Sequence, residues 1–425
     1  MNNKRLSYFC FLVIISFSIA TKAHSQNLNY VHKVVRELGQ PNMYGRAAIN
    51  NGDSIAADYI AKEFSRFKLK SFGNDYYQYF TQPAVYQSEV SLQLGKGQIL
   101  KPEDEFYVLG FSPTYDIEIN NEKPIFIDGK EHWELIKKTK LDNIILVFNQ
   151  KTMPISLKEM AKFIDSDFTQ VKPKLVIFQG YEHINYYIGR ENVKQVPVIQ
   201  LVGEPIGKTI DYLKLHIKTT STLSHKTQNV VGYVEGKNKD KYVLITSHYD
   251  ALGMFGDKVF PGAQDNASGT AAVLDFASYF AENKPPYSLV FITFGAEEVG
   301  MLGSHYFADN PLVPLDKIHL VINLDLVGSG SEGLSIVNGT SQDKFVKQLE
   351  RINNSEKYFW KILSADNRCN SDHCVFVEKN IPAVFLMTCG QEHKWSHSIY
   401  DSYENLPFTK YESLFRLIGD YIKGL

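Results

Sequence analysis

Four apolar runs in the C-terminal half of the chain constrain its fold more than any other feature. They are residues 242–250 (YVLITSHYD), 288–298 (SLVFITFGAEE), 318–328 (IHLVINLDLVG) and 381–388 (IPAVFLMT). A strand that is apolar along its whole length must be covered on both faces, as the strands of a parallel sheet are. Helical patterns alternate with these runs, at 267–283, 302–309, 341–353 and 408–423. The alternation predicts a three-layer α/β sandwich around a mostly parallel central sheet.

The chain before these runs has two kinds of sequence pattern, one helical and one of short strands. Residues 27–84 are predicted to be helical, because DSIAADYIAKEFSRF has a cap at Asp53 or Ser54 and an apolar face made of Ile55, Tyr59, Ile60 and Phe64. Short strands follow from about 88 to 220, in EVSLQLG, KPIFID, NIILVFN, PKLVIFQG and VPVIQLVG. We therefore predict that residues 26–87 and 223–425 form one domain, and that residues 88–222 form a smaller, β-rich domain inserted into it.

The N-terminus is typical of a secretory signal peptide. Lys4 and Arg5 precede an apolar run from Leu6 to Ala20, and Ala23-His24-Ser25 offers a cleavage site. The alternative, a transmembrane anchor, is disfavoured because the run is shorter than the ~20 residues that a span needs. We expect residues 1–25 to be removed, which leaves an extracytoplasmic protein, periplasmic or secreted, without a stable membrane anchor. The net charge of −2 gives no basic surface for nucleic acid.

Three cysteines remain after such cleavage. Cys369 and Cys374 are close enough in sequence to form a small disulfide-closed loop, and Cys389 would then be left unpaired. The alternative, three buried thiols, is equally compatible with the sequence.

Polar side chains stand where the predicted strands end. In parallel sheets, functional residues gather at the carboxyl ends of the strands. Each residue also has an ordinary explanation, since a histidine can be structural, Asp265 can cap the next helix and paired glutamates suit a first helical turn. The presence of all these residues at the strand ends favours a metal site, because burying several carboxylates together is costly unless a cation neutralises them. We therefore expect a pair of divalent metal ions among His248, Asp250, Asp265, Glu297, Glu298, Asp325 and a histidine of HKWSHSIYDSYENL.

Five motifs in order, HYDALG, PGAQDNASG, GAEEVGMLGS, NLDLVG and HSIYDSYENL, resemble the zinc-dependent M28 metallopeptidases, which include secreted bacterial aminopeptidases and glutamate carboxypeptidases. The resemblance covers residues 228–425 and the helical segment 27–84. It implies two zinc ions, the first held by His248 and Asp325, the second by Glu298 and His397, with Asp265 bridging them. It also implies a cis peptide bond between Asp265 and Asn266.

The resemblance assigns Glu297 as the general base. Neighbouring side chains on extended backbone point apart, so Glu298 can reach a metal ion while Glu297 faces the substrate. Glu297 would take a proton from a water that bridges the zinc ions and later deliver it to the leaving amine. Asp250 lies two positions beyond His248 and would hydrogen-bond its imidazole, fixing the orientation of the ring.

The last motif departs from the family pattern at one position. Several relatives have a tyrosine directly before the final histidine, where its hydroxyl helps to hold the oxyanion, and this chain has Ser396. Tyr400 or Tyr403 could compensate. His393 competes with His397 as the ligand, and we prefer His397 because the family pattern continues beyond it. A further family-like segment, SDHCVF with Asp372 and His373, is predicted to border the site.

We therefore expect a secreted dizinc exopeptidase that acts on peptides, most simply an aminopeptidase, although carboxypeptidase and dipeptidase activities stay open. The inserted region resembles a protease-associated domain more weakly, and its alternative is a spacer without a role in recognition. Two other functions compete. One is a single-zinc transferase like the glutaminyl cyclases, and the other is a non-catalytic binding ectodomain.

Overall fold

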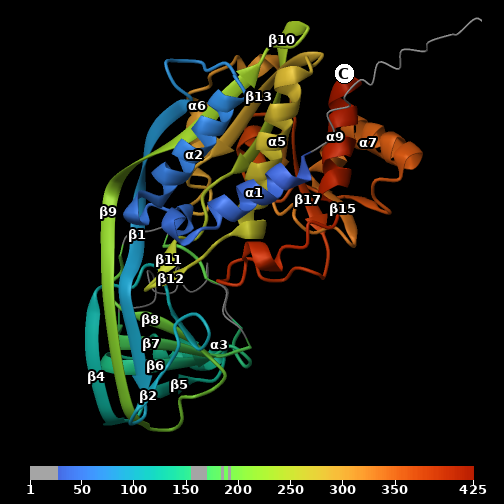
Figure 1. Cartoon of the computed structure of the whole chain (residues 1–425). Coiled ribbons are helices and arrows are strands. Elements are labelled where there is room, and N and C mark those ends of the chain that lie inside the picture. The colour runs from blue at the N-terminus through green and yellow to red at the C-terminus, as the bar shows by residue number, and fades with distance from the viewer. Residues whose placement is uncertain (1–26, 155–169, 183–185, 190–192) are drawn as a thin grey trace, which may run out of the picture.

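The computed structural model describes residues 27–154, 170–182, 186–189 and 193–425 (Figure 1). The predicted signal peptide, residues 1–25, lies outside the described residues. Within the described ranges, no helix combines the length and apolar character that crossing a bilayer would require.

The centre of the molecule is a ten-stranded sheet, in which the four apolar runs form neighbouring parallel strands. They are β10 (Asn238–His248), β13 (Tyr287–Phe294), β14 (Ile318–Leu324) and β17 (Ala383–Cys389), in the order β17-β14-β10-β13. The remaining strands extend the sheet on both sides: β15 (Gly333–Val337) and β16 (Ile362–Ser364) beyond β17, and β9 (Ile210–Val234), β1 (Tyr77–Leu94), β2 (Gln98–Ile99) and β4 (Tyr115–Glu122) beyond β13. The predicted parallel strands at the centre of the sheet are confirmed, and the strands at its sides pair mainly antiparallel.

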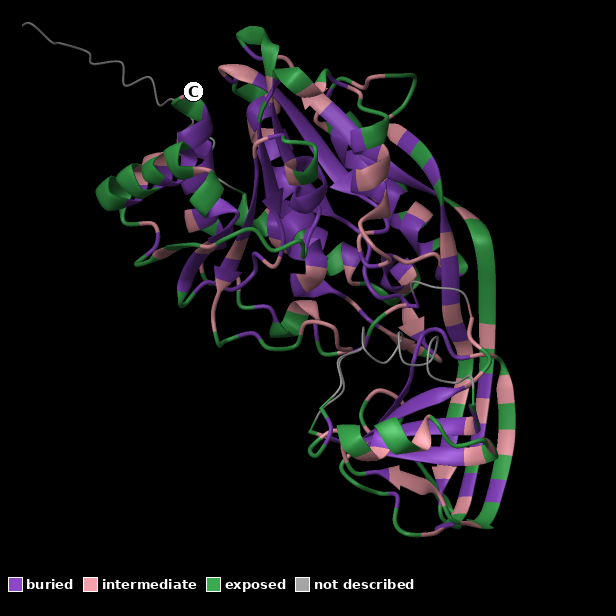
Figure 2. Ribbon diagram, turned by 180° about the vertical axis from the view of Figure 1, so that it is seen from behind, coloured by how far each residue is buried: buried purple, intermediate pink, exposed green. Residues whose placement is uncertain are grey.

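Helices cover both faces of this sheet and bury a core on each. Successive residues of β10 point to opposite faces, so Val243 and Ile245 lie in one core and Leu244 lies in the other. The first core is shared with α1 (Leu28–Leu38), α2 (Gly52–Arg66), α5 (Ser268–Glu282), α7 (Asp343–Glu356) and α9 (Tyr411–Lys423), and the second with α6 (Leu302–Asp309) and α8 (His373–Glu378). Figure 2 shows the buried residues concentrated in the strands between these layers. The three-layer arrangement is as predicted.

A second part of the molecule, with its own core, lies at the far end of two long strands. β1 and β9 pair antiparallel along their lengths, from Tyr77 opposite Val230 to Leu94 opposite Leu213, and run side by side into this part (Figure 1). It contains α3 (Lys130–Ile136) and a five-stranded sheet, β3-β8-β7-β6-β5, made of β3 (Phe106–Val108), β5 (Ile125–Ile127), β6 (Leu141–Asn149), β7 (Val171–Tyr181) and β8 (Val198–Val202). Because β1 and β9 continue past residues 88 and 222, the domain division at these positions stays a prediction.

The expectation of helix throughout residues 27–84 is wrong at its end. Residues from Tyr77 onward belong to β1, which alternates between buried and exposed positions and pairs with β9. Helix α2 also begins at Gly52, with Asn51 as the N-cap residue, so Asp53 lies in the first turn and Ile55 is exposed rather than on the apolar face. Short elements complete the described chain: η1 (Pro41–Arg46), η2 (Ile49–Asn51), β11 (Met254–Phe255), β12 (Lys258–Val259), η3 (Ala263–Ala267), η4 (Leu315–Lys317), η5 (Gly339–Ser341) and η6 (Tyr403–Asn405).

Candidate metal centre

The central strands deliver the predicted ligands to one edge of the sheet. His248 is the last residue of β10, Asp325 directly follows β14, and Glu298 lies four residues after the end of β13. Parallel pairing sets His248 opposite Phe294, the last residue of β13, so these strand ends meet. Asp265 lies in η3, directly before α5, and its peptide bond to Asn266 is cis, as the resemblance implies.

Two groups of ligand atoms share Asp265. In the first, His248 Nε2 lies 3.3 Å from Asp265 Oδ1 and 3.5 Å from Asp325 Oδ1. In the second, His397 Nε2 lies 3.2 Å from Asp265 Oδ2 and 3.9 Å from Glu298 Oε2. Within each group the ligand atoms lie within 4.8 Å of one another. A tetrahedral zinc ion with bonds of about 2.0–2.2 Å separates its donor atoms by about 3.3–3.6 Å, so both groups have dimensions that suit zinc.

The charges of these groups are not balanced by the side chains alone. Burial and the neighbouring Asp265 raise the pKa of Glu298 to about 7. The pKa of His397 rises to about 9 because Glu298 and Asp265 outweigh the opposing effect of burial. Asp325 Oδ1 is buried and has no hydrogen-bond partner among the described residues, although it lies beside His248. A divalent cation in each group would neutralise the acids and provide Asp325 Oδ1 with a partner.

Asp250 supports both His248 and the paired glutamates. Its main-chain carbonyl, rather than its carboxylate, lies 3.1 Å from His248 Nδ1, and the nearer carboxylate oxygen is 3.6 Å away. The carboxylate instead accepts the backbone N–H groups of Glu297 and Glu298, each at 3.1 Å. Asp250 therefore fixes the imidazole through its backbone and fixes the glutamate pair through its side chain.

Glu297 is partly buried beside the two groups, and its backbone is one of the two that Asp250 holds. Burial, reinforced by the charge of Glu298 and opposed by that of His248, raises the pKa of Glu297 well above its usual range. Bound cations would act in the opposite direction and favour the ionised carboxylate. Glu297 can therefore act as a base when cations bound in the two ligand groups keep its carboxylate ionised.

The C-terminal loop places its two histidines differently. His397 joins the second group, whereas His393 Nε2 lies 3.1 Å from Asp401 Oδ1, and neither of these two buried residues belongs to either ligand group. Asp401 in turn accepts the backbone N–H groups of Gln264 at 2.7 Å and Asp265 at 3.0 Å. Asp401 was not identified from the sequence, although it stands within the HSIYDSYENL motif that did identify His397.

Arg46 is a second residue that sequence reasoning missed. Its guanidinium is completely buried and donates to the carbonyl oxygens of Leu38, Tyr249, Pro261 and Gly262 at 2.5–2.9 Å. Tyr249 stands between His248 and Asp250, and Gly262 stands three residues before Asp265. Burial lowers the pKa of Arg46 to about 10, so the group stays charged at neutral pH. No local motif marks it, because its partners are backbone atoms up to 216 positions away.

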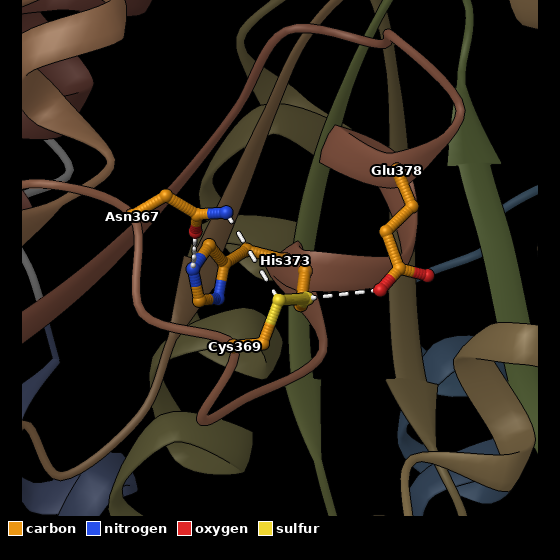
Figure 3. Close-up of a disulfide and its surroundings, with 5 residues drawn as sticks. Asn367, Cys369, His373 and Glu378 are labelled. Carbon is orange, nitrogen blue, oxygen red and sulfur yellow. Dashed lines mark hydrogen bonds between the residues drawn. A yellow bond between two sulfur atoms is a disulfide. The ribbon is translucent and has the colours of Figure 1, made fainter.

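The segment SDHCVF borders the centre, as predicted. Ser371 Oγ donates to Asp325 Oδ2 at 2.8 Å, while Asp372 accepts a hydrogen bond from Ser304 at 2.6 Å. Cys369 and Cys374 form a disulfide around Ser371, and Figure 3 shows this bond beside His373. Cys389 has a free thiol. Neither Asp372 nor His373 belongs to either ligand group.

The two tyrosines considered as oxyanion donors have other partners. The Tyr400 hydroxyl donates to Asp104 at 2.8 Å, and the Tyr403 hydroxyl accepts from Arg36 of α1 at 2.8 Å. Neither tyrosine hydroxyl is therefore free to act as the oxyanion donor that the family pattern suggests.

A cleft of about 400 Å³ opens beside His397, between the two parts of the molecule. Residues of the 88–222 region form one wall, and Phe260 together with residues 394–400 forms the other. Three carboxylates, Glu103, Asp104 and Glu182, line the cleft against one ammonium, that of Lys394. The cleft therefore combines access to a ligand residue with a negative lining.

Part of the chain is similar to known peptidases. Residues 229–422 match the model of peptidase family M28. Aminopeptidase YwaD of Bacillus subtilis is 29% identical over 221 residues, which cover 50% of this chain and 47% of that protein. An aminopeptidase of Pseudomonas aeruginosa is 33% identical over 174 residues, 39% of this chain and 30% of that protein. The chain thus spans about half, or less, of the curated relatives it matches.

Solved structures extend the likeness to almost the whole chain. BSAP, a zinc aminopeptidase from Bacillus subtilis, has a TM-score of 0.70 and 20% identity, covering 93% of this chain and 95% of its own. A glutaminyl cyclase of Bacteroides thetaiotaomicron, bound to N-acetylhistamine, has a TM-score of 0.51 and 13% identity, covering 94% and 99%. At these identities the likeness establishes the fold.

Proposed function

We propose that the chain, whose residues 229–422 match the model of peptidase family M28, is a zinc-dependent exopeptidase that removes the N-terminal residue of peptides. One observation carries this proposal. Two groups of ligand atoms, each with an imidazole nitrogen and carboxylate oxygens at distances that suit zinc, share the carboxylate of Asp265.

His248, Asp325 and Asp265 would hold one zinc ion, and His397, Glu298 and Asp265 would hold the other. When bound, a zinc pair polarises the scissile carbonyl and makes the attacking water more acidic. Sets of this kind, with imidazole and carboxylate ligands and no cysteine, are typical of catalytic rather than structural zinc.

Glu297 moves the proton in the proposed reaction. Its carboxylate accepts a proton from the attacking water and returns it to the leaving amine, which is general base catalysis followed by general acid catalysis. Asp250 holds Glu297 in place through the backbone N–H at 3.1 Å, while the equivalent bond to Glu298 keeps the neighbouring side chain with the ligands. Asp250 thereby links the two glutamates, which its carboxylate holds, to His248, which its main-chain carbonyl holds.

The charge of the cleft favours an aminopeptidase over a carboxypeptidase. Glu103, Asp104 and Glu182 would attract the free α-ammonium of a peptide and repel a free α-carboxylate. Glutaminyl cyclase activity is the second candidate, supported by the structural likeness to such an enzyme. That reaction uses a single zinc ion, so it would not require one of the two ligand groups.

The signal peptide pattern supports an extracytoplasmic location, and the disulfide between Cys369 and Cys374 agrees with an oxidising compartment. N-terminal sequencing of the mature protein from cell fractions tests this part of the proposal. A mature chain that retains residues 1–25 in the cytoplasm would contradict it.

The activity is tested with purified mature protein, a panel of fluorogenic aminoacyl amides and metal analysis. We expect two zinc ions per chain, loss of activity with a chelator, and recovery on adding zinc. Glu297→Gln should keep zinc and fold but lose about 10²–10⁴-fold in kcat, while the exposed control Glu131→Gln should keep wild-type rates. Wild-type turnover by Glu297→Gln, or cyclisation of N-terminal glutamine without peptide hydrolysis, would refute the proposal.

A further inference from the structure

His397 is contacted by a segment of the 88–222 region that lies far from it in sequence. His397 Nδ1 lies 3.1 Å from the carbonyl oxygen of Tyr186, and the Tyr186 N–H donates to the His397 carbonyl at 3.0 Å. Nε2 of the same ring faces Asp265 and Glu298. Because Nδ1 faces a carbonyl acceptor, the proton of a neutral imidazole belongs on Nδ1, which leaves the Nε2 lone pair for a metal ion.

The backbone of His397 also needs support. Its φ of 62° lies in the left-handed region, which is unfavourable for a residue with a side chain unless the surroundings hold it. The N–H of Tyr186 supplies one such contact to the carbonyl of His397. The ring of Tyr187 adds a second, since it packs edge-on against the imidazole with the ring centroids 4.8 Å apart.

Tyr186 is itself anchored by aromatic rings from both parts of the molecule. Its side chain is only 4% exposed and stacks on Phe260 at 4.2 Å between ring centroids. Tyr107 of the 88–222 region and Phe255 pack against it at 4.7 and 5.7 Å. The Tyr107 hydroxyl also donates to the carbonyl of Tyr187 at 2.6 Å. The buried ring thus fixes the backbone that meets His397.

The other ligand group is held by different contacts. His248 Nδ1 faces the carbonyl of Asp250, and Asp325 accepts from Ser371, all within residues 223–425. The 88–222 region therefore contacts one ligand histidine through Tyr186 and Tyr187, while the supports of the other group come from the surrounding domain. A disturbance of Tyr186 should consequently act on one group and spare the other.

We propose that Tyr186 is a positioning residue for His397, so that the 88–222 region is a structural part of the second zinc group rather than a spacer. The proposal rests on the proposed zinc-dependent function. Without the buried ring, the carbonyl of residue 186 moves off Nδ1, the imidazole loses its orientation and the second zinc is held more weakly. The first zinc, held by His248 and Asp325, is unaffected.

Zinc binding to the intact mature protein tests this directly, by chelator competition and by visible spectroscopy of the cobalt-substituted protein. Tyr186→Ala should lower the affinity for one of the two zinc ions by about 10–100-fold and leave the affinity for the other within about twofold of wild type. Tyr186→Phe keeps the ring and should behave as wild type. Tyr187→Ala, at a half-exposed side chain that is less critical to folding, should weaken the same zinc to a smaller extent.

The matched control is Phe178→Ala. Phe178 is a fully buried residue of the same region, stacked on Phe148 at 4.8 Å, so its removal destabilises that core without touching His397. Phe178→Ala should lower Tm yet retain both zinc ions. The inference is overturned if folded Tyr186→Ala binds both zinc ions as tightly as wild type, or if Phe178→Ala loses the same zinc. Wild-type protein that binds no zinc at all would instead overturn the proposed function, and this inference with it.

Discussion

Replacing Arg46 with methionine is expected to lower the free energy of unfolding by about 3–5 kcal/mol, the usual cost of removing one partner from a buried charged network. Methionine has a similar reach but donates no hydrogen bond. The carbonyls of Leu38, Tyr249 and Pro261 would lose a charged donor, at about 1–3 kcal/mol for each buried acceptor left unsatisfied. The carbonyl of Gly262 also accepts the N–H of Ala267, so losing its hydrogen bond from Arg46 should cost less free energy.

Part of this cost should appear as weaker metal binding. The lost bonds hold the backbone next to His248 and the loop that leads to Asp265, and the variant also loses a positive charge near several carboxylates. Denaturant unfolding followed by circular dichroism, in the presence of chelator and again with zinc, separates the two effects. Zinc should raise the midpoint less in Arg46→Met than in wild type, because the stabilisation by a ligand increases with the logarithm of its affinity.

Two variants control for charge and for the substitution itself. Arg46→Lys keeps a cation, but one ammonium cannot reach carbonyls from three segments, so an intermediate loss is expected. Arg416→Met removes an exposed arginine that pairs with Glu412 one helical turn away, and should change the free energy by under about 0.5 kcal/mol. A loss below about 1 kcal/mol for Arg46→Met would refute the reasoning.

Three further changes have defined outcomes. His225 pairs with buried Asp53 at 2.7 Å, and this hydrogen bond raises the pKa of His225 despite burial. The loss of stability in His225→Asn should therefore be largest below about pH 6.5 and become smaller as the pH rises through the folded-state pKa. Urea unfolding across about pH 5–8 measures this dependence. Gly269→Ala would place a Cβ 2.3 Å from the Leu324 carbonyl and should lower the unfolding free energy by about 1–3 kcal/mol in the same assay; an unchanged midpoint would contradict this. Burial raises the pKa of Glu103 to about 7, so at about pH 8 Glu103→Gln removes one negative charge from the cleft. At that pH it should raise KM for substrates with a basic N-terminal residue more than for neutral ones, and an equal change for both would contradict a role of charge.

The central sheet and most of the ligand groups followed from local patterns. An apolar run that must be covered on both faces predicts a parallel strand, and parallel strands bring their carboxyl ends to one edge. His248, Glu298 and Asp325 were therefore predictable from where each run ends, whereas His397 needed the family pattern because it stands in a loop. The start of β1 at Tyr77 was missed because its alternating pattern becomes meaningful only beside β9.

The contacts that support the ligands had no comparable signal. Arg46 and Asp401 bind backbone carbonyl and N–H groups, and Tyr186 contacts His397 through its own backbone. Backbone groups are common to nearly all residue types, so no residue type marks these contacts. Asp250 shows the same limit, because its carboxylate reaches the backbone of Glu297 and Glu298 instead of the imidazole for which the sequence suggested it.

The sequence alone determined the layered fold, the edge of the sheet where acids and imidazoles meet, and the resemblance to peptidase family M28 over residues 229–422, because strand periodicity and side-chain chemistry are local properties. The tertiary structure decided what holds each of the two ligand groups in place. Hydrogen bonds to backbone atoms and the packing of Tyr186 between two parts of the chain depend on distances across space, which no local pattern records.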